Sequence, residues 1–221
     1  MLERLHGGLV VSCQPVVGGP MDKPDLVVAL ALAAKDGGAA GLRIEGLANL
    51  RAVRAACSLP IIGLIKRPIP DSPVFITPGV DDVQALIEAG ADIIAFDATL
   101  RPRPATVLSL VRAVSDGGCL AMADIATFED AQAAVAAGAD VIGTTLSGYT
   151  GGPIPEGPDL ELVTQCAALG LPVFAEGRYH RPDQARAAIE AGARAVVVGS
   201  AITRPEHITG WFVSALRSAQ L

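Results

Sequence analysis

Short apolar runs alternate with amphipathic segments along the chain, and the alternation is clearest toward the C-terminus. There the apolar run 172–175 ends at Glu176, and an amphipathic helix begins at Pro182. A second apolar run, 195–198, follows this helix. A strand, a helix and a strand in this order predict two parallel strands that are buried on both faces.

Further apolar runs predict strands that each lead into a helix. The runs are short, as buried strands of a parallel sheet are, and glycine or proline marks most of their boundaries. The proline-rich segment 68–78 is predicted to be an ordered insertion, and the last helix is predicted to begin at Pro205. The predicted strands cover residues 9–13, 41–46, 60–67, 92–97, 119–124 and 140–146.

A recurring peptide sets the number of strands. The sequence Ala-Gly-Ala recurs with its glycine at positions 90, 138 and 192, each time between a predicted helix and a predicted strand. A spacing of about fifty residues fits two strand and helix units. Together with a similar sequence at residues 37–39, four such quarters fill the chain and give eight strands. We therefore predict a single (β/α)8 TIM barrel over residues 1–221.

Composition is consistent with this fold and indicates the cellular compartment of the protein. Apolar residues make up 51% of the chain and aromatic residues 4%, which is typical of parallel strands under closely packed helices. No apolar run reaches the roughly 18 residues of a membrane span. The N-terminal sequence also lacks the basic start and apolar segment of a signal peptide. We expect a cytoplasmic protein without a membrane partner.

Charge and cysteine spacing argue against two other classes of function. The net charge of -6 and the isoelectric point near 5.0 argue against a nucleic-acid surface. The four cysteines are widely scattered and form no C-x-x-C pair, so they indicate neither a zinc site nor a redox motif. We expect thiols that lie in the core.

Two successive predicted strands end in glycine. The backbone N–H groups of Gly177, Gly199 and Ser200 can approach an anion closely. The loops after the seventh and eighth strands of (β/α)8 barrels commonly bind phosphate. The alternative is that these glycines only form tight turns. Because they follow two neighbouring strands, we favour a phosphate site.

A lysine follows the third predicted strand. Lys66 comes after an apolar run, where that strand would reach the mouth of a barrel. Desolvation and neighbouring cations lower the pKa of a lysine, and we expect Arg43 and Arg67 to be the cations. Lys66 is therefore a candidate general base. The alternative is a lysine that only extends into solvent.

Other polar residues occupy equivalent positions at strand ends. In a barrel, Gln14, Arg43, Asp124 and Glu176 would surround the same opening as Lys66. A base, a cation, two carboxylates and an amide would then lie around one pocket. This arrangement favours proton abstraction next to a carbonyl by Lys66, with Glu176 or Asp124 as its partner.

A glycine-rich loop follows the sixth predicted strand. Residues 147–153 carry Tyr149, which we expect to contact a ligand, although flexibility alone would also explain the glycines. The three histidines, His6, His180 and His207, fall outside the predicted site residues. The sequence therefore predicts neither a metal nor another cofactor.

Several motifs at the predicted strand ends run along nearly the whole chain. They are Ser12-Cys-Gln14, Ile62-Gly-Leu-Ile-Lys-Arg67, Val74-Phe-Ile-Thr-Pro78, Asp97-Ala-Thr99, Arg101-Pro-Arg-Pro104, Ala123-Asp-Ile-Ala-Thr127, Thr144-Thr-Leu-Ser-Gly-Tyr-Thr150, Ala175-Glu-Gly-Arg178 and Val198-Gly-Ser-Ala-Ile-Thr-Arg-Pro205. In this order and register, the motifs resemble the N-acetylmannosamine-6-phosphate 2-epimerase family.

The resemblance implies a barrel of the ribulose-phosphate-binding type and an isomerase without a cofactor. Such an enzyme inverts C2 of N-acetylmannosamine 6-phosphate to give N-acetylglucosamine 6-phosphate, in sialic acid and amino sugar catabolism. The resemblance also implies that Lys66 is the acid and base, with Glu176 as its neighbouring carboxylate. The substrate-binding residues that it implies are Gln14, Arg43, Asp124 and Arg204. Tyr149 and Arg178 are further candidates for substrate binding.

Two positions differ from the pattern of this family. Pro68-Ile69 stands where Asp-Tyr is expected, and Glu45 stands where asparagine or another small polar residue is more usual. Both differences concern local contacts with the sugar rather than the class of reaction.

Other interpretations stay open on the residues alone. Another phosphosugar isomerase, lyase or synthase on the same barrel would keep the glycine-rich anion site and could use the lysine to form a Schiff base. A non-catalytic phosphosugar-binding barrel would keep the pocket without proton transfer. Trp211 and Phe212 in the last helix are the basis for a further hypothesis, a homodimer.

Overall fold

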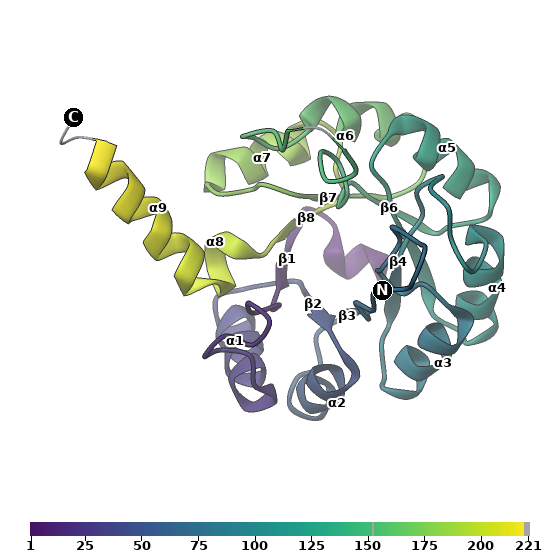
Figure 1. The fold of residues 1–221 in the computed structure, drawn as a ribbon, viewed down its shortest axis with the longest axis horizontal. Coiled ribbons are helices and arrows are strands. Elements are labelled where there is room, and N and C mark those ends of the chain that lie inside the picture. Colours follow the sequence, from purple (N-terminus) through teal and green to yellow (C-terminus); the bar gives the residue numbers. More distant parts are fainter. Residues whose placement is uncertain (152, 219–221) are drawn as a thin grey trace.

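A closed barrel of eight parallel strands forms the centre of the protein (Figure 1), in a computed structural model that describes residues 1–151 and 153–218. The strands follow one another around the barrel in chain order, and the last pairs with the first. This confirms the (β/α)8 barrel predicted from the recurring peptide. The strands are β1 (Gly8–Ser12), β2 (Gly41–Glu45), β3 (Ile61–Leu64), β4 (Ile93–Asp97), β5 (Leu120–Asp124), β6 (Val141–Gly143), β7 (Val173–Glu176) and β8 (Ala195–Val198).

Helices cover the outside of the barrel, and a short 3-10 helix, η1 (Leu2–Leu5), precedes the first strand. Each of the first seven strands leads into one helix, and two helices follow β8. The helices are α1 (Pro24–Asp36), α2 (Leu47–Ala56), α3 (Val80–Glu88), α4 (Val107–Asp116), α5 (Phe128–Ala136), α6 (Leu160–Ala167), α7 (Pro182–Glu190), α8 (Ser200–Thr203) and α9 (Pro205–Ser218). No helix among the described residues is long and apolar enough to cross a membrane.

The core has two layers because successive side chains of a strand point to opposite faces. In β7, Val173 and Ala175 face the layer between strands and helices, whereas Phe174 points into the barrel. The barrel interior also contains Leu5 of η1, which packs against Gly41 at the start of β2. Side chains therefore fill the barrel at its amino-terminal end, and ligands have access only from the carboxyl ends of the strands.

β3 is shorter than predicted, because it ends at Leu64 rather than at residue 67. The residues that follow pair with the insertion instead of with a neighbouring strand. Lys66 and Ile76 form an antiparallel bridge, and the N–H of Arg67 donates a hydrogen bond to the carbonyl of Phe75 at 2.8 Å. The segment 68–78 is ordered, as predicted, and it fixes the position of Lys66.

The last helix does not cover its own barrel. α9 extends away from the strands beside α8 (Figure 1), and Phe212 and Leu216 are 70% and 68% exposed. Trp211 contacts the barrel through His180, whose ring centre lies 4.4 Å from that of the indole. An apolar helix face therefore remains exposed on this chain.

Close packing of helices on β3 gives a first testable prediction. A Cβ atom at Gly63 would lie 2.9 Å from the Cβ of Ala91 and within 3.3 Å of methyl groups of Leu50 and Leu86. We expect Gly63→Ala to lower the free energy of unfolding by about 1–3 kcal/mol, because the core becomes overpacked.

Urea unfolding followed by circular dichroism measures this change. Gly157→Ala is the matched control, because a Cβ atom there meets nothing within 4 Å, and its effect should stay within about 0.5 kcal/mol. Equal stability of Gly63→Ala and the wild type would show that α2 and α3 pack less tightly on β3 than described.

Candidate active site

The carboxyl ends of the strands surround a cavity of about 310 Å³. The predicted site residues that line it are Gln14, Lys66, Tyr149, Glu176, Gly177, Arg178, Gly199, Ser200 and Arg204. Arg43 lines an adjoining cavity of about 330 Å³, which shares Lys66 and Glu176 with the first. Asp124 is fully buried beside Arg43. The fold therefore brings the residues predicted at separate strand ends to one place.

A buried arginine joins two carboxylates at the base of these cavities. Nη2 of Arg43 on β2 lies 2.6 Å from Oδ2 of Asp124 on β5, and Nη1 lies 3.1 Å from Oε2 of Glu176 on β7. The exposed fractions of these side chains are 1%, 0% and 15%. Because a buried charge without a partner is strongly destabilising, each of the three groups depends on the others.

Glu176 can exchange a proton near neutral pH. Burial raises the pKa of Glu176 to about 6, and the neighbouring Asp124 carboxylate adds to the rise. Arg43, the Thr145 hydroxyl and Lys66 oppose the rise because they favour the ionised form. A carboxyl group of this kind is suited to acid and base chemistry.

Lys66 is an exposed residue at the mouth, where it lines both cavities, and its amine is the candidate base. Desolvation by the surrounding walls lowers the pKa of Lys66, and the positive charges of Arg43 and Arg204 lower it further. Glu176 and Glu45 act in the opposite direction. The predicted influence of Arg43 on this lysine is therefore confirmed.

The predicted influence of Arg67 on Lys66 is wrong. Nη2 of Arg67 lies 2.7 Å from Oδ2 of Asp82, so its guanidinium group pairs with α3. The reason is that the side chains of neighbouring residues in an extended segment point to opposite sides. Lys66 faces the cavity, so Arg67 faces α3. The second cation near the lysine is Arg204, which the sequence places far away along the chain.

The predicted phosphate corner lies on one side of the first cavity. Gly177 has a φ angle of 114°, which favours glycine, and a Cβ atom at Gly199 would lie 3.3 Å from the Cβ of Ser12. Nε of Arg204 donates a hydrogen bond to the carbonyl of Gln14 at 2.7 Å, which fixes the guanidinium group at this corner. Backbone N–H groups beside an arginine suit an anion. Phosphate binding here stays a prediction.

Arg178 holds the loop after β6, of which residue 152 lies outside the described residues. Its Nε donates a hydrogen bond to the carbonyl of Gly157 at 2.6 Å, and its Nη1 donates another to the carbonyl of Ser147. The guanidinium carbon lies 5.4 Å from the centre of the Tyr149 ring. Arg178 therefore positions Tyr149 at the rim, and the predicted contacts of both residues with substrate stay predictions.

Thr145 also belongs to the site, although it is not among the residues predicted from the sequence. Its Oγ1 lies 2.6 Å from Oδ1 of Asp124 and 3.1 Å from Oε2 of Glu176, and it lines both cavities. The sixth strand was predicted to continue to residue 146, whereas β6 ends at Gly143. The two adjacent threonines after the apolar run were the signal that could have placed this hydroxyl at the mouth.

The described residues, 1–151 and 153–218, hold no group of three or more histidine, cysteine, aspartate or glutamate side chains that could bind a metal ion. The carboxylates nearest to the cavities instead face Arg43. The shifted pKa values of Lys66 and Glu176 suit these two groups to proton transfer, and their role stays a prediction.

Known proteins resemble this chain along nearly its whole length. Residues 27–218 match the NanE family model, which is described as "Putative N-acetylmannosamine-6-phosphate epimerase". The chain is 57% identical over 218 residues to a Yersinia pseudotuberculosis protein, "Putative N-acetylmannosamine-6-phosphate 2-epimerase", and the match covers 99% of this chain and 94% of that protein.

A longer relative and two solved structures complete the comparison. The chain is 59% identical over 220 residues to the "Bifunctional enzyme NanE/NanK" of Brucella melitensis, of whose length it spans only 42%. The N-acetylmannosamine-6-phosphate 2-epimerase of Clostridium perfringens superposes with a TM-score of 0.94 at 40% identity, over 97% of this chain and 96% of that chain. A deoxyribose phosphate aldolase from Aeropyrum pernix, with 18% identity and a TM-score of 0.66 over 92% of this chain and 90% of that chain, shares the fold alone.

The raised pKa of Glu176 gives a second testable prediction. The pKa rises from 4.5 to about 6 on folding, so this group stabilises the protein fully below pH 4.5 and that contribution is lost as the pH rises through about 6. Glutamine cannot ionise. The free energy of unfolding of Glu176→Gln, relative to that of the wild type, should therefore increase by about 1–2 kcal/mol as the pH rises from acidic to neutral.

Urea unfolding at a series of pH values between about 4.5 and 7 tests this expectation. Glu129→Gln, at an exposed position on α5, is the matched control. A Glu176→Gln difference that does not change with pH would contradict the assigned pKa.

Proposed function

The chain belongs to the N-acetylmannosamine-6-phosphate epimerase family, and from this premise we propose that it inverts C2 of N-acetylmannosamine 6-phosphate to give N-acetylglucosamine 6-phosphate. The reaction belongs to sialic acid and amino sugar catabolism. The observation that carries the proposal is the position of Lys66, which shares one cavity with Glu176 and the predicted phosphate corner.

Inversion at C2 requires a base that is unprotonated near physiological pH, which for a lysine is the neutral amine. Opening of the sugar ring produces an aldehyde at C1, and this carbonyl makes the proton on C2 acidic. The neutral amine of Lys66 accepts that proton, and a proton then returns to the opposite face of C2, donated either by the ammonium group of Lys66 or by a second acid. The lowered pKa of Lys66 increases the fraction of amine that is neutral and able to act.

The groups beside Lys66 stabilise the charge that develops. When the C2 proton leaves, negative charge builds up on the oxygen at C1. Arg43 and the protonated form of Glu176 are hydrogen-bond donors in the cavity that Lys66 also lines. Glu176 in its ionised form stabilises the ammonium form of Lys66.

The predicted phosphate corner orients the substrate in the cavity. The open-chain sugar is flexible, and its phosphate on C6 lies several bonds from the reacting carbon. Arg204 and the backbone N–H groups of Gly177, Gly199 and Ser200 hold this phosphate at one side of the cavity. Binding energy far from C2 thereby places C2 at the amine of Lys66.

Two alternatives use the same cavity differently. A lyase on this barrel would form a Schiff base between Lys66 and its substrate, which borohydride traps. A phosphosugar-binding barrel without catalysis would bind the substrate and leave its C2 proton in place. The family relationship favours the epimerase over both.

Exchange of the C2 proton gives a third testable prediction. During incubation with N-acetylmannosamine 6-phosphate in deuterated water, we expect the wild type to form N-acetylglucosamine 6-phosphate with deuterium at C2, as read by NMR. Lys66→Met should reduce the rate at least about 100-fold, because the base is lost. It should still bind the substrate.

Lys35→Met, an exposed lysine at the end of α1, is the matched control and should keep the wild-type rate. Wild-type protein that binds the sugar phosphate without exchange at C2 would indicate the non-catalytic alternative. A borohydride-trapped adduct on Lys66 would indicate the lyase.

We further propose that the protein forms a homodimer through α9. An apolar groove of about 300 Å³ lies between α7 and α8. Its lining includes Leu9, Ala185, Val198 and Ile202. The exposed apolar face of α9 from a second copy matches this groove, and burial of both surfaces would stabilise the pair.

The mass of the protein in solution gives a fourth testable prediction. We expect light scattering to give about twice the chain mass of 22.5 kDa. The double variant Phe212→Asp, Leu216→Asp should shift the mass toward the monomer, because burying two carboxylates in an apolar contact is unfavourable. Leu108→Asp on the exposed side of α4 is the matched control. A monomeric wild type would contradict the dimer.

A further inference from the structure

The barrel mouth has two lobes of different character that meet at Lys66. The phosphate lobe contains Gly177, Gly199, Ser200 and Arg204. The other, which we call the apolar lobe after its walls of Phe75, Ile76 and Leu146, also contains Arg43 and has a volume of about 330 Å³. Both lobes share Gln14, Lys66, Thr145, Tyr149 and Glu176. The proposed base therefore lies at the boundary between the phosphate lobe and a lobe in which apolar walls adjoin Arg43.

The apolar lobe lies beside Lys66 because of strand register. Lys66 and Ile76 are paired in an antiparallel bridge, and paired residues of such a bridge have their side chains on the same face. Ile76 and Leu146 are 3% and 5% exposed and belong to the apolar cluster inside the barrel. Phe75 is 37% exposed and lies at the rim. The lobe thus has a buried aliphatic floor and an aromatic edge.

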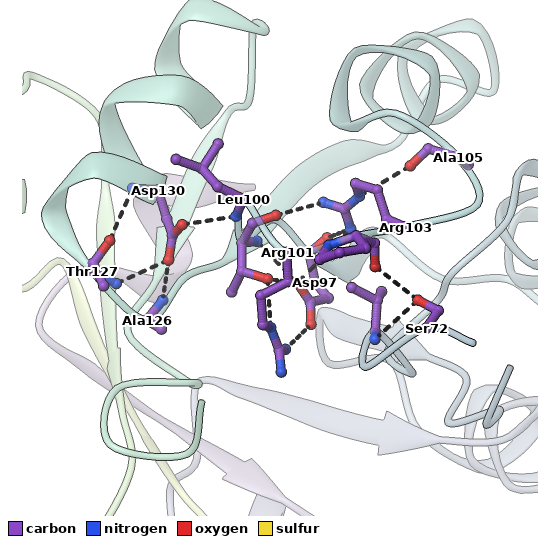
Figure 2. Close-up of polar contacts among 12 residues, drawn as sticks. Ser72, Asp97, Leu100, Arg101, Arg103, Ala105, Ala126, Thr127 and Asp130 are labelled. Atoms are coloured by element: carbon purple, nitrogen blue, oxygen red, sulfur yellow. Dashed lines mark hydrogen bonds and ion pairs between the residues drawn. The ribbon is translucent and has the colours of Figure 1, made fainter. Parts of the chain in front are cut away.

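Polar contacts hold the segment that carries Phe75 and Ile76. Oγ of Ser72 donates a hydrogen bond to the carbonyl of Pro102 at 2.9 Å and accepts one from the N–H of Val74 at 3.2 Å (Figure 2). The loop that contains Pro102 is held in turn by Arg103, which donates to the carbonyls of Thr99 at 3.2 Å and Ala105 at 3.0 Å. The wall of the apolar lobe is therefore formed before a ligand arrives.

The substrate class of the proposed function explains a lobe of this kind. In a 2-acylamino sugar 6-phosphate, the acyl group is attached through nitrogen to C2, the carbon that Lys66 deprotonates. With the phosphate on C6 in the phosphate lobe and C2 at Lys66, the acyl group extends to the other side of the lysine. The apolar lobe lies there, and it suits a small alkyl end such as a methyl group.

We propose that the apolar lobe binds the acyl end of the 2-acylamino group, and that Phe75 and Ile76 limit the length of the acyl chain. This inference rests on the proposed function. It adds residues that decide which N-acyl sugars are substrates. A hydrophobic pocket of fixed size discriminates against one additional methylene by about 10-fold or more.

A series of acyl groups tests the proposal. The substrates are mannosamine 6-phosphates that carry N-acetyl, N-propanoyl or N-glycolyl groups, and the quantity measured is kcat/KM for inversion at C2. We expect the wild type to prefer N-acetyl over N-propanoyl by about 10-fold. Phe75→Ala and Ile76→Val enlarge the lobe, so each should reduce this preference by about 3-fold or more.

The N-glycolyl substrate separates size from polarity. It has the length of the propanoyl group but ends in a hydroxyl, which the apolar walls formed by Phe75 and Ile76 do not satisfy. Both enlarged variants should therefore gain more with N-propanoyl than with N-glycolyl. Leu108→Ala on α4 is the matched control and should keep the wild-type ratios. Melting temperatures of all variants identify any loss of fold, and Ile76→Val tests the lobe independently of the exposed Phe75.

The outcomes distinguish this inference from the function on which it rests. If the wild type inverts C2 but both variants lose kcat/KM equally for all three substrates, the acyl assignment is overturned and the epimerase function remains. If the wild type exchanges no C2 proton in any substrate, the proposed function fails and the acyl assignment fails with it. A gain that favours N-propanoyl in both variants supports the assignment.

Discussion

The candidate site depends on the ion cluster of Arg43, Asp124 and Glu176. One guanidinium group with 1% of its surface exposed lies between two carboxylates from different strands. Their mutual attraction offsets the desolvation of three charges only while all three keep their positions. Asp124 meets the arginine with both oxygens, at 2.6 and 3.2 Å, whereas Glu176 has a single contact at 3.1 Å. Asp124 therefore fixes the arginine, and Glu176 keeps the freedom to take up a proton.

The same cluster acts on Lys66 without touching it. Arg43 lowers the pKa of Lys66, while Glu176 raises it and so limits the effect. Arg204 adds a second positive charge from the phosphate corner. A phosphate bound at that corner would partly neutralise Arg204, so substrate binding and the proton affinity of the lysine are linked through charge. The barrel makes this possible because it brings β2, β5 and β7 around one opening.

The last helix connects the site with the proposed dimer. His180 lines both the first cavity and the apolar groove, and its ring lies against Trp211 of α9. Movement of α9 into the groove of a second copy would therefore change the surroundings of a residue at the cavity wall. The proposed dimer contact and the predicted site therefore both adjoin the loop after β7.

The sequence determined the barrel and the residues at its mouth, because the signals involved are local. Apolar runs indicate strands that are buried on both faces, and the spacing of the recurring Ala-Gly-Ala indicates the number of strands. Lys66, Glu176 and the glycines after β7 and β8 follow from their places at strand ends.

Only the tertiary structure decided which charges meet. Arg67 pairs with α3, Arg204 reaches Lys66 from the far end of the chain, and Thr145 lies between two carboxylates. It also decided that Lys66 pairs with the insertion and that α9 leaves the barrel. Electrostatic and packing contacts depend on distances between residues remote in sequence, which hydrophobic periodicity does not encode.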